Sequence, residues 1–254
     1  SIMDLTPEAK CATVYSVMNK FIFTEEELPQ RSQGWHDARK MIVGASDVAT
    51  VLNLMNRFEK PKSLWKRKLG KLKPKKENDA MRRGAEMEDM AGVVISSELE
   101  TNWGIKNPKL DKYFAIHPEH RFLGVSFDGV DLENKFITEI KCPQKVWNFR
   151  KIFEDGIPDH YYPQVQMQLH VANALWGITK AYFCSYYPDG AYIVDRVEFM
   201  EHHKTLVIID IDYNEAYCQK VVKVLETFHK FLEEGKWNDD EFLAVLKEFE
   251  GTEC

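Results

Sequence analysis

The sequence predicts an α/β chain of the α+β type, in which helices flank a mixed central β-sheet. Strand-like runs cluster in the middle of the chain, whereas amphipathic segments with helical periodicity precede and follow them. A length of 254 residues with 44% hydrophobic content also suffices for a sizeable core. Because no linker-like composition interrupts the chain, we predict one domain over 1–254, with a helical part over about 1–100, a sheet core over about 110–200 and C-terminal helices over about 213–250.

The first third of the chain is expected to be helical, with one basic loop. Residues 7–21 are amphipathic, and Ser46 or Asp47 is a suitable N-cap for a helix that ends near Leu54. Another helix is expected over 62–69, followed by the basic loop 70–78. Asp79 is expected to cap a longer helix that continues through Glu98.

Three strands are expected next, over 113–116, 122–128 and 136–141. If a two-residue loop, Glu133-Asn134, closes the last two into a hairpin, the numbers of each opposed pair of residues sum to 267. Asp128 then lies across from Glu139, and Glu139 shares one strand face with Lys141. Like charges opposed on a sheet are unfavourable, so we expect a divalent cation and Lys141 to offset them.

The remaining elements are expected to be helices and one further hairpin. Helices near 146–154 and 161–176 precede two strands, 180–187 and 192–199, which are predicted to pair across Pro188-Asp189-Gly190. The second of these helices carries an apolar stripe that we assign to the core, made of Val165, Leu169, Ala172 and Trp176. Two helices, over 214–234 and 239–250, are expected to end the chain.

Composition excludes several classes of protein. No apolar stretch is long enough to cross a membrane, and the N-terminus lacks the basic-then-apolar order of a signal peptide. The five cysteines are scattered without a CxxC spacing, which argues against a disulfide framework, a zinc site or an iron–sulfur cluster. We therefore expect a reducing compartment.

The charge of the chain is unevenly distributed. The net charge is −6, yet residues 57–83 hold twelve Lys/Arg against three Asp/Glu, a local balance of +9. A basic zone on an acidic body can bind a polyanion, because the local potential governs binding. The alternative is a solvated helix face and loop, and the composition alone leaves both interpretations open.

Two carboxylates and a lysine on adjacent strands suit metal-dependent phosphodiester hydrolysis. Asp128 and Glu139 are natural Mg²⁺ ligands, and the backbone carbonyl of Ile140 offers a third oxygen. Lys141 would orient an attacking water or help to deprotonate it, and a second ion would stabilise the leaving oxygen. The alternative is an exposed strand with alternating Glu and Lys, a pattern that arises by chance in many sequences.

Four ordered blocks between about Trp35 and Gln168 resemble the λ exonuclease/YqaJ-type viral recombinase family, a branch of the PD-(D/E)xK nucleases. The resemblance implies a restriction-endonuclease-like core. Phe127 stands where the motif's name calls for proline, a site at which this superfamily is lax. The blocks are Trp35-His36-Asp37-Ala38-Arg39 leading to Gly44-Ala45-Ser46, then Arg83-Gly84-Ala85-Glu86-Met87-Glu88, then Asp128 with Glu139-Ile140-Lys141-Cys142-Pro143, and finally Tyr162-Pro163-Gln164-Val165-Gln166-Met167-Gln168.

The resemblance implies roles for individual residues of the cleavage site. Asp128, Glu139 and the Ile140 carbonyl match the metal ligands, and Lys141 matches the catalytic lysine. Glu88 matches an upstream acid at the edge of the metal site, and Gln164 matches a glutamine that positions the water or the scissile phosphate. By itself Glu88 reads as an ordinary surface glutamate of an acidic helix, and Gln164 reads equally well as a polar residue on the outer face of its helix. Gln166 and Gln168 leave the choice of glutamine open. Gly84, one turn before Glu88, predicts a close approach of this helix to the sheet.

The first block implies a site for a DNA end. Arg39 and Ser46 match a pocket that grips a 5′-phosphate, which suits a guanidinium fork and a hydroxyl near a helix N-terminus. Trp35 matches an aromatic wedge against the terminal base pair, and stacking of this kind is worth about 1–3 kcal/mol per base. The alternatives are a surface arginine, a plain N-cap serine and a buried core tryptophan.

The implied activity is Mg²⁺-dependent removal of mononucleotides from 5′-phosphorylated ends of double-stranded DNA, with two ions at the site and Mn²⁺ as a substitute. The remaining 3′ single strand would serve recombination. The family also implies a ring-shaped homotrimer and a single-strand annealing protein as partner. The site would operate in the host cytoplasm for a bacteriophage, or the nucleus for a virus of eukaryotes. The alternatives are an endonuclease or structure-specific nuclease with the same core, and a non-catalytic DNA-binding protein on this fold.

Overall fold

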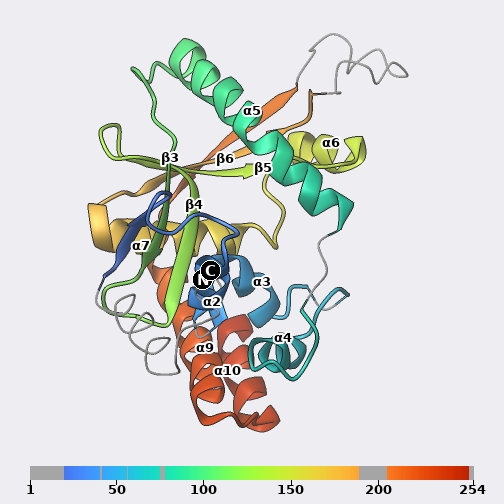
Figure 1. Cartoon of the computed structure of the whole chain (residues 1–254). Coiled ribbons are helices and arrows are strands. Elements are labelled where there is room, and N and C mark those ends of the chain that lie inside the picture. Colours follow the sequence, from blue (N-terminus) through green and yellow to red (C-terminus); the bar gives the residue numbers. More distant parts are fainter. Residues whose placement is uncertain (1–19, 41, 56, 75–77, 189–204, 252–254) are drawn as a thin grey trace.

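The computed structural model describes residues 20–40, 42–55, 57–74, 78–188 and 205–251. These residues form a seven-stranded mixed sheet flanked by helices, as predicted (Figure 1). Neighbouring strands are antiparallel except for β5–β6 and β2–β4, which are parallel. The strands lie in the order β1 (Ile22–Thr24), β3 (Asp111–Ile116), β4 (Leu123–Asp131), β5 (Phe136–Lys141), β6 (Lys180–Tyr186) and β7 (Leu206–Asp212), and β2 (Val43–Gly44) pairs with β4 outside this order.

The β4–β5 hairpin has the register that the sequence predicts. Gly129 pairs with Thr138, and Asp131 pairs with Phe136, so the numbers of each pair sum to 267. The predicted length of the loop is wrong, however, because four residues rather than two connect the strands. Asp131 explains the longer turn: its buried carboxylate accepts the amides of Glu133 and Asn134 at 3.0 and 2.7 Å, as Asp commonly does in turns.

Along one edge of β4, two different strands pair with its two ends and leave the residues between them unpaired on that edge. β3 occupies one edge of β4 from Gly124 to Val130. On the other edge, β2 pairs with residues 123–124 and β5 pairs with residues 129–131. Residues 125–128 therefore lie between β2 and β5, and Asp128 is at the point where β5 separates from β4. The sheet thus opens beside one of the predicted metal ligands.

Two hydrophobic clusters cover opposite faces of the sheet, because alternate strand residues point to opposite sides. Ile137 belongs to the larger cluster, whereas Phe136 and Ile140 belong to the smaller one, which α5 (Asp79–Asn102) covers. Figure 1 shows α5 on the opposite side of the sheet from the C-terminal helices. The larger cluster is packed by helices α3 (Val48–Val51), α4 (Pro61–Lys68), α7 (Tyr162–Trp176), α9 (Glu215–Glu234) and α10 (Asp239–Gly251).

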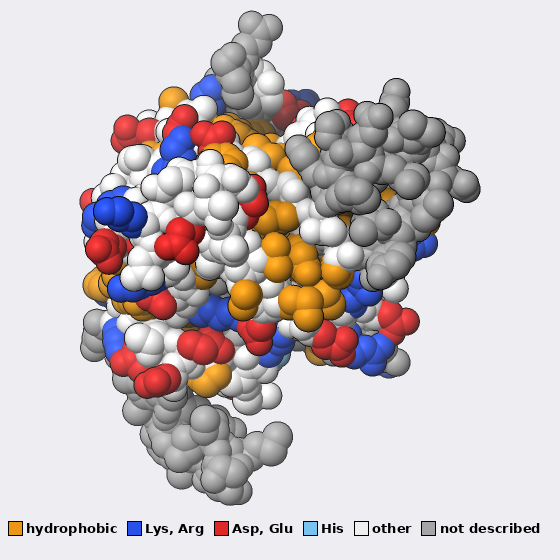
Figure 2. All heavy atoms as spheres, turned by 90° about the horizontal axis from the view of Figure 1, so that it is seen from above, with side chains coloured by type: hydrophobic (Ala, Val, Ile, Leu, Met, Phe, Trp, Pro, Cys, Tyr) orange, Lys and Arg blue, Asp and Glu red, His pale blue; other side chains and the backbone are white. Residues whose placement is uncertain are grey.

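The α5 side of the molecule retains exposed apolar side chains. Figure 2, which views the molecule from above, shows hydrophobic side chains gathered among acidic and basic ones. On α5 itself, Met90 and Val93 are 55% and 72% exposed. This helix is therefore less amphipathic than α9, whose apolar side is fully packed into the core.

Most predicted helices and strands agree with the structure. β5, α4, α7, α9 and α10 lie within one residue of the predicted ends, as does α6 (Val146–Asp155). In α7 the predicted stripe is buried at Val165, Leu169 and Ala172, and Trp176 packs against the same cluster. The helix predicted over 7–21 lies almost wholly outside the described residues.

Several helix caps and a glycine differ from the prediction. Asn78, not Asp79, caps α5, because its side chain accepts the Met81 amide at 2.8 Å. The helix expected near Ser46 is a 3₁₀ turn, η2 (Ala45–Asp47), followed by one short helix that ends at Val51. A Cβ added at Gly84 would meet nothing within 4 Å, so the predicted close approach of α5 at this glycine is wrong.

Three strands were missed, and one pairing was assigned to the wrong partner. β1 and β2 are only three and two residues long, too short for an alternating pattern. β6 is paired on both edges, in parallel with β5 and antiparallel with β7, so neither edge is open for the predicted hairpin. Residues 192–199 themselves lie outside the described part of the chain.

Candidate active site

The carboxylate of Glu139 is the most heavily bonded group of the candidate site. It is 3% exposed and lies on β5 under the N-terminal half of α7. Gln164 Nε2 donates to Oε1 at 2.8 Å, and Gln168 Nε2 donates to Oε2 at 2.6 Å. Lys141 Nζ lies 2.5 Å from Oε1. Each carboxylate oxygen therefore has a fixed partner, and the orientation of the carboxylate is set before any ligand arrives.

Asp128 lies next to Glu139 without pairing to it in the sheet. The β4–β5 ladder ends at Gly129–Thr138, and Asp128 Oδ2 instead accepts the amide of Ile140 at 2.8 Å. The pKa of Asp128 is raised well above its ordinary value, because burial disfavours its charge and the carboxylates of Glu139 and Glu88 repel it. The site thus concentrates negative charge where a cation would relieve the repulsion.

Lys141 carries the positive charge of the site. Burial disfavours its ammonium, yet the adjacent Glu139 carboxylate, with Tyr161 and Asp128, outweighs burial and raises the lysine pKa. Its ammonium also lies over the Tyr161 ring, 4.8 Å from the centroid. Glu139 and Lys141 share one face of β5, as the strand alternation predicts, and Lys141 is protonated in this arrangement.

Glu88 approaches the site from α5, on the far side of the sheet from α7. Its side chain is 13% exposed, so the alternative of an ordinary surface glutamate is wrong. Lys112 Nζ lies 2.8 Å from its Oε1, and Arg31 Nη2 lies 3.4 Å from its Oε2. Its charge raises the pKa of Asp128 and contributes, after burial, to raising the pKa of Cys142 to about 11. Glu88 is therefore at the edge of the carboxylate group.

The three glutamines of α7 have two different roles. Gln164 and Gln168, one helical turn apart, both bond to Glu139. Gln166 points elsewhere: its Nε2 donates to the Asp212 carbonyl and its Oε1 accepts the Asn214 amide, both at 2.9 Å. Gln166 thus ties α7 to the start of α9. Sequence reasoning favoured Gln164 and left Gln168 open, although the spacing of four residues placed both on one face.

Arg39 and Ser46 form a second group of polar side chains, which is connected to the carboxylate group through β4. Arg39 lies in the last turn of α2 (Gln33–Lys40), Ser46 lies in η2, and Arg39 Nη2 is 2.6 Å from Ser46 Oγ. The guanidinium stacks over Trp35, 4.1 Å from the ring centroid. Trp35 is half-buried and donates its indole N–H to Ser126 Oγ at 2.9 Å. Because Ser126 lies on β4 two residues before Asp128, this contact connects the arginine–serine pair with the carboxylates.

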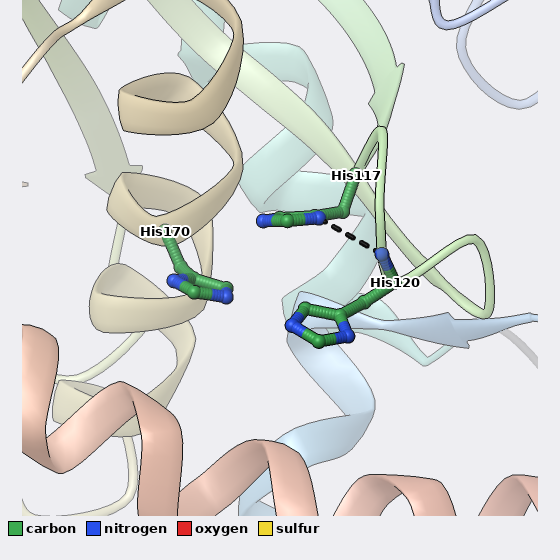
Figure 3. Close-up of side chains that lie close together, drawn as sticks. All are labelled: His117, His120 and His170. Atoms are coloured by element: carbon green, nitrogen blue, oxygen red, sulfur yellow. Dashed lines mark hydrogen bonds between the residues drawn. The ribbon is translucent and has the colours of Figure 1, made fainter.

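A cluster of three histidines lies away from the predicted residues. Figure 3 shows His117 and His120 on the β3–β4 connection facing His170 of α7. The rings of His117 and His170 stack at 4.5 Å with 20° between their planes, so their in-plane lone pairs do not converge on one ion. His117 Nδ1 also accepts the amides of Glu119 and His120, which leaves the proton of the neutral ring on Nε2. This geometry does not suit a metal ion.

The fold is that of known exonucleases. The crystal structure of LHK-Exo in complex with dAMP is similar with a TM-score of 0.58 and 23% identity, over 87% of this chain and 98% of that one. An alkaline exonuclease (LHK-Exo) from Laribacter hongkongensis gives a TM-score of 0.53 and 22% identity, over 87% and 99% of the chains. A phage related exonuclease from Haemophilus somnus 129PT gives 0.51 and 14%, over 77% and 96%. The architecture therefore defines an exonuclease-type fold.

The sequence gives the more specific assignment. The model of the YqaJ-like viral recombinase domain matches residues 34–175, which is more than half of the chain. The chain therefore belongs to the YqaJ-like viral recombinase domain family, as its four sequence blocks predict. No curated protein sequence matches the chain significantly. Among the helices that the structure describes, none combines the length and apolar character needed to cross a bilayer.

Proposed function

We propose that this protein is a Mg²⁺-dependent 5′→3′ exodeoxyribonuclease that degrades one strand of linear double-stranded DNA from 5′-phosphorylated ends. The observation that carries the proposal is the oriented Glu139 carboxylate, beside Asp128 and Lys141 at the opening of the sheet. The Arg39–Ser46 pair is connected to these carboxylates through Trp35, on which Arg39 stacks, and Ser126, which accepts the Trp35 indole N–H. Family membership supports the same function.

The donor set fits a hard divalent cation. Asp128, Glu139 and the Ile140 carbonyl would hold Mg²⁺, with Glu88 at the edge, and two ions with Mn²⁺ as a substitute suit the same oxygen ligands. The raised pKa of Asp128 supports this fit, because burial and the carboxylates of Glu139 and Glu88 disfavour its charge more than Lys141 compensates for it. When bound, such ions lower the pKa of water and stabilise charge on the phosphate.

The residues of the chain divide the remaining tasks among them. Gln168 is fully buried and orients Glu139, whereas Gln164 is half-buried and can also reach the attacking water or the scissile phosphate. Lys141, held protonated by its neighbours, faces the charge that develops as the phosphodiester is attacked. Its raised pKa favours orientation of the water over its deprotonation.

The Arg39–Ser46 pair supplies end recognition. A guanidinium beside a hydroxyl offers several donors to a terminal phosphate, and stacking on Trp35 restrains the guanidinium. The Trp35 side chain is half-buried, and its indole N–H is fixed by the bond to Ser126. This arrangement suits a wedge whose exposed part stacks on the terminal base pair. Binding of a terminal phosphate by this pair would direct cleavage to DNA ends.

The assembly and the cellular context follow from the family. We infer a ring-shaped homotrimer around the DNA and a single-strand annealing protein that receives the 3′ strand. The corresponding site of action is the host cytoplasm for a bacteriophage or the nucleus for a virus of eukaryotes. Light scattering of the purified protein coupled to size exclusion tests the trimer, since a monomer in solution contradicts it.

The function is tested with end-labelled linear duplexes that carry either 5′-phosphate or 5′-hydroxyl, and with covalently closed circles. We expect Mg²⁺-dependent release of mononucleotides from phosphorylated linear DNA only. Lys141→Ala is expected to lower the rate by at least about a hundredfold, the loss typical of a removed electrostatic contact. Lys223→Ala, an exposed lysine of α9, is the control and keeps full activity. Cleavage of circles would indicate an endonuclease, and DNA binding without hydrolysis would indicate a non-catalytic protein.

A further inference from the structure

Lys68 is a buried member of the basic run that the sequence marks as a candidate polyanion site. It lies in the last turn of α4, and its side chain is 7% exposed. Its ammonium donates to the carbonyls of Arg39 and Ile42 at 3.1 and 2.8 Å and lies 2.8 Å from Asp47 Oδ2. An ammonium has three protons, so these three partners satisfy it completely.

The three partners lie along one short segment, which begins at Arg39 and ends at Asp47. Arg39 lies in the last turn of α2, Ile42 precedes β2, and Asp47 follows Ser46 directly. Asp47 Oδ2 also accepts the Gly44 amide at 3.0 Å, which ties the middle of the segment to the same point. Lys68 therefore joins both ends of the segment whose side chains, Arg39 and Ser46, meet at 2.6 Å.

The helix that carries Lys68 provides a rigid support. Leu64 and Trp65 of α4 are buried in the larger hydrophobic cluster, and Trp65 Nε1 donates to the Phe231 carbonyl at 2.8 Å. Precise placement of a binding group requires supporting residues on rigid elements. The connection from the core through Lys68 to Arg39 meets this requirement.

We propose that Lys68 is a positioning residue for recognition of the 5′-phosphate, acting through Arg39 and Ser46 rather than by touching DNA. This inference rests on the proposed function of the arginine–serine pair. A direct phosphate contact is excluded by the three fixed partners of the ammonium. Exposed cations are better placed for the DNA backbone: Lys40, Lys71 and Lys73 line an open pocket of about 690 Å³, to whose wall Lys68 also contributes.

The test compares kcat/KM on linear duplexes with 5′-phosphate and with 5′-hydroxyl ends. Lys68→Met removes the ammonium and keeps the length of the side chain. Because this change leaves Asp47 buried without its cation, the double variant Asp47→Asn/Lys68→Met is measured beside it; Asn still accepts the Gly44 amide. Lys66→Met, an exposed lysine two residues earlier on α4, is the matched control. Thermal unfolding and circular dichroism establish that each variant is folded.

We expect both Lys68 variants to lower the phosphate-to-hydroxyl ratio by about tenfold, which corresponds to about 1.4 kcal/mol of discrimination. Activity on 5′-hydroxyl ends is expected to change little, a split that a purely structural loss of stability would not produce. Lys66→Met is expected to keep the parental ratio. Folded Lys68 variants with the parental ratio would overturn the positioning role alone, whereas a parent that ignores the phosphate would overturn the proposed end recognition itself.

Discussion

The histidine cluster makes the stability of this protein sensitive to mild acid. Burial, with repulsion from the neighbouring histidines, lowers the pKa of His117 from 6.5 to about 3 and that of His170 to about 4. Both rings are therefore neutral in the folded protein at pH 5, whereas in the unfolded chain they bind protons below about pH 6.5. The unfolded state then holds more protons, so the free energy of unfolding falls as the pH drops from 6.5 towards 4.

The size of this effect follows from the burial of each ring. A histidine that stays neutral costs up to about 1.4 kcal/mol per pH unit below pH 6.5, or about 2 kcal/mol at pH 5. His117 is 3% exposed and should approach this limit. His170 is only partly buried, so solvent screening reduces its share. We expect a combined loss of about 3 kcal/mol between pH 6.5 and 5.

Urea unfolding at pH 7.5, 6.5 and 5.0 measures this loss as a difference between two proteins. In the variant His117→Asn/His170→Asn, the amide oxygens can replace the Nδ1 acceptors without titrating. The Glu226 carboxylate, 3.8 Å from His120, and the Tyr213 hydroxyl, 2.8 Å from His170, remain in both proteins. The variant should lose about 3 kcal/mol less than the parent, and the exposed-site variant His36→Asn should lose as much as the parent. Parallel pH curves for the parent and the double variant would refute the reasoning.

Two further predictions concern Glu139 and the glycines. Gln168→Met removes the donor to Glu139 Oε2 and should weaken Mn²⁺ binding by about tenfold, as loss of a residue that orients a ligand typically does; unchanged titration calorimetry would contradict this. Gly129→Ala should lower the free energy of unfolding by about 1–3 kcal/mol, because the new Cβ would lie 2.3 Å from Thr138 Oγ1. Gly84→Ala meets open space and should raise it by up to about 1 kcal/mol through helix propensity. Equal urea midpoints for the two alanine variants would contradict the prediction for the glycines.

The sequence predicted best those features that depend on neighbouring residues along the chain. α9 was found because its apolar period extends over 20 residues, and β5 was found because Asn134 and Pro143 flank a strand-like run. The hairpin register followed from a loop centred on Glu133-Asn134. The length of the turn was predicted wrongly because the Asp131 side chain accepts the backbone amides of Glu133 and Asn134, which stabilises a four-residue connection. Short strands such as β2 have no period to detect, and they form because β4 offers them a free edge.

The candidate site shows the same division. The sequence identified Arg39, Ser46 and Glu88 as site residues; the structure pairs Arg39 with Ser46 and Glu88 with Lys112, and their roles are proposals. Gln168 was left undecided, because three glutamines in one helix are distinguishable only when the strand beneath them is known. Lys68 was hidden within a basic run, since burial of one lysine among many depends on contacts 21 to 29 residues away.

The sequence by itself determined the family, the mixed sheet with flanking helices, and the set of residues that concentrates charge beside β5. These follow from local periodicity and from ordered motifs, which a linear chain displays directly. Only the tertiary structure decided which polar groups become partners: Gln168 with Glu139, Lys68 with Asp47, and His117 with His170. The reason is physical, because a polar side chain satisfies itself with whichever group folding brings within about 3 Å, and that choice depends on the packing of distant segments.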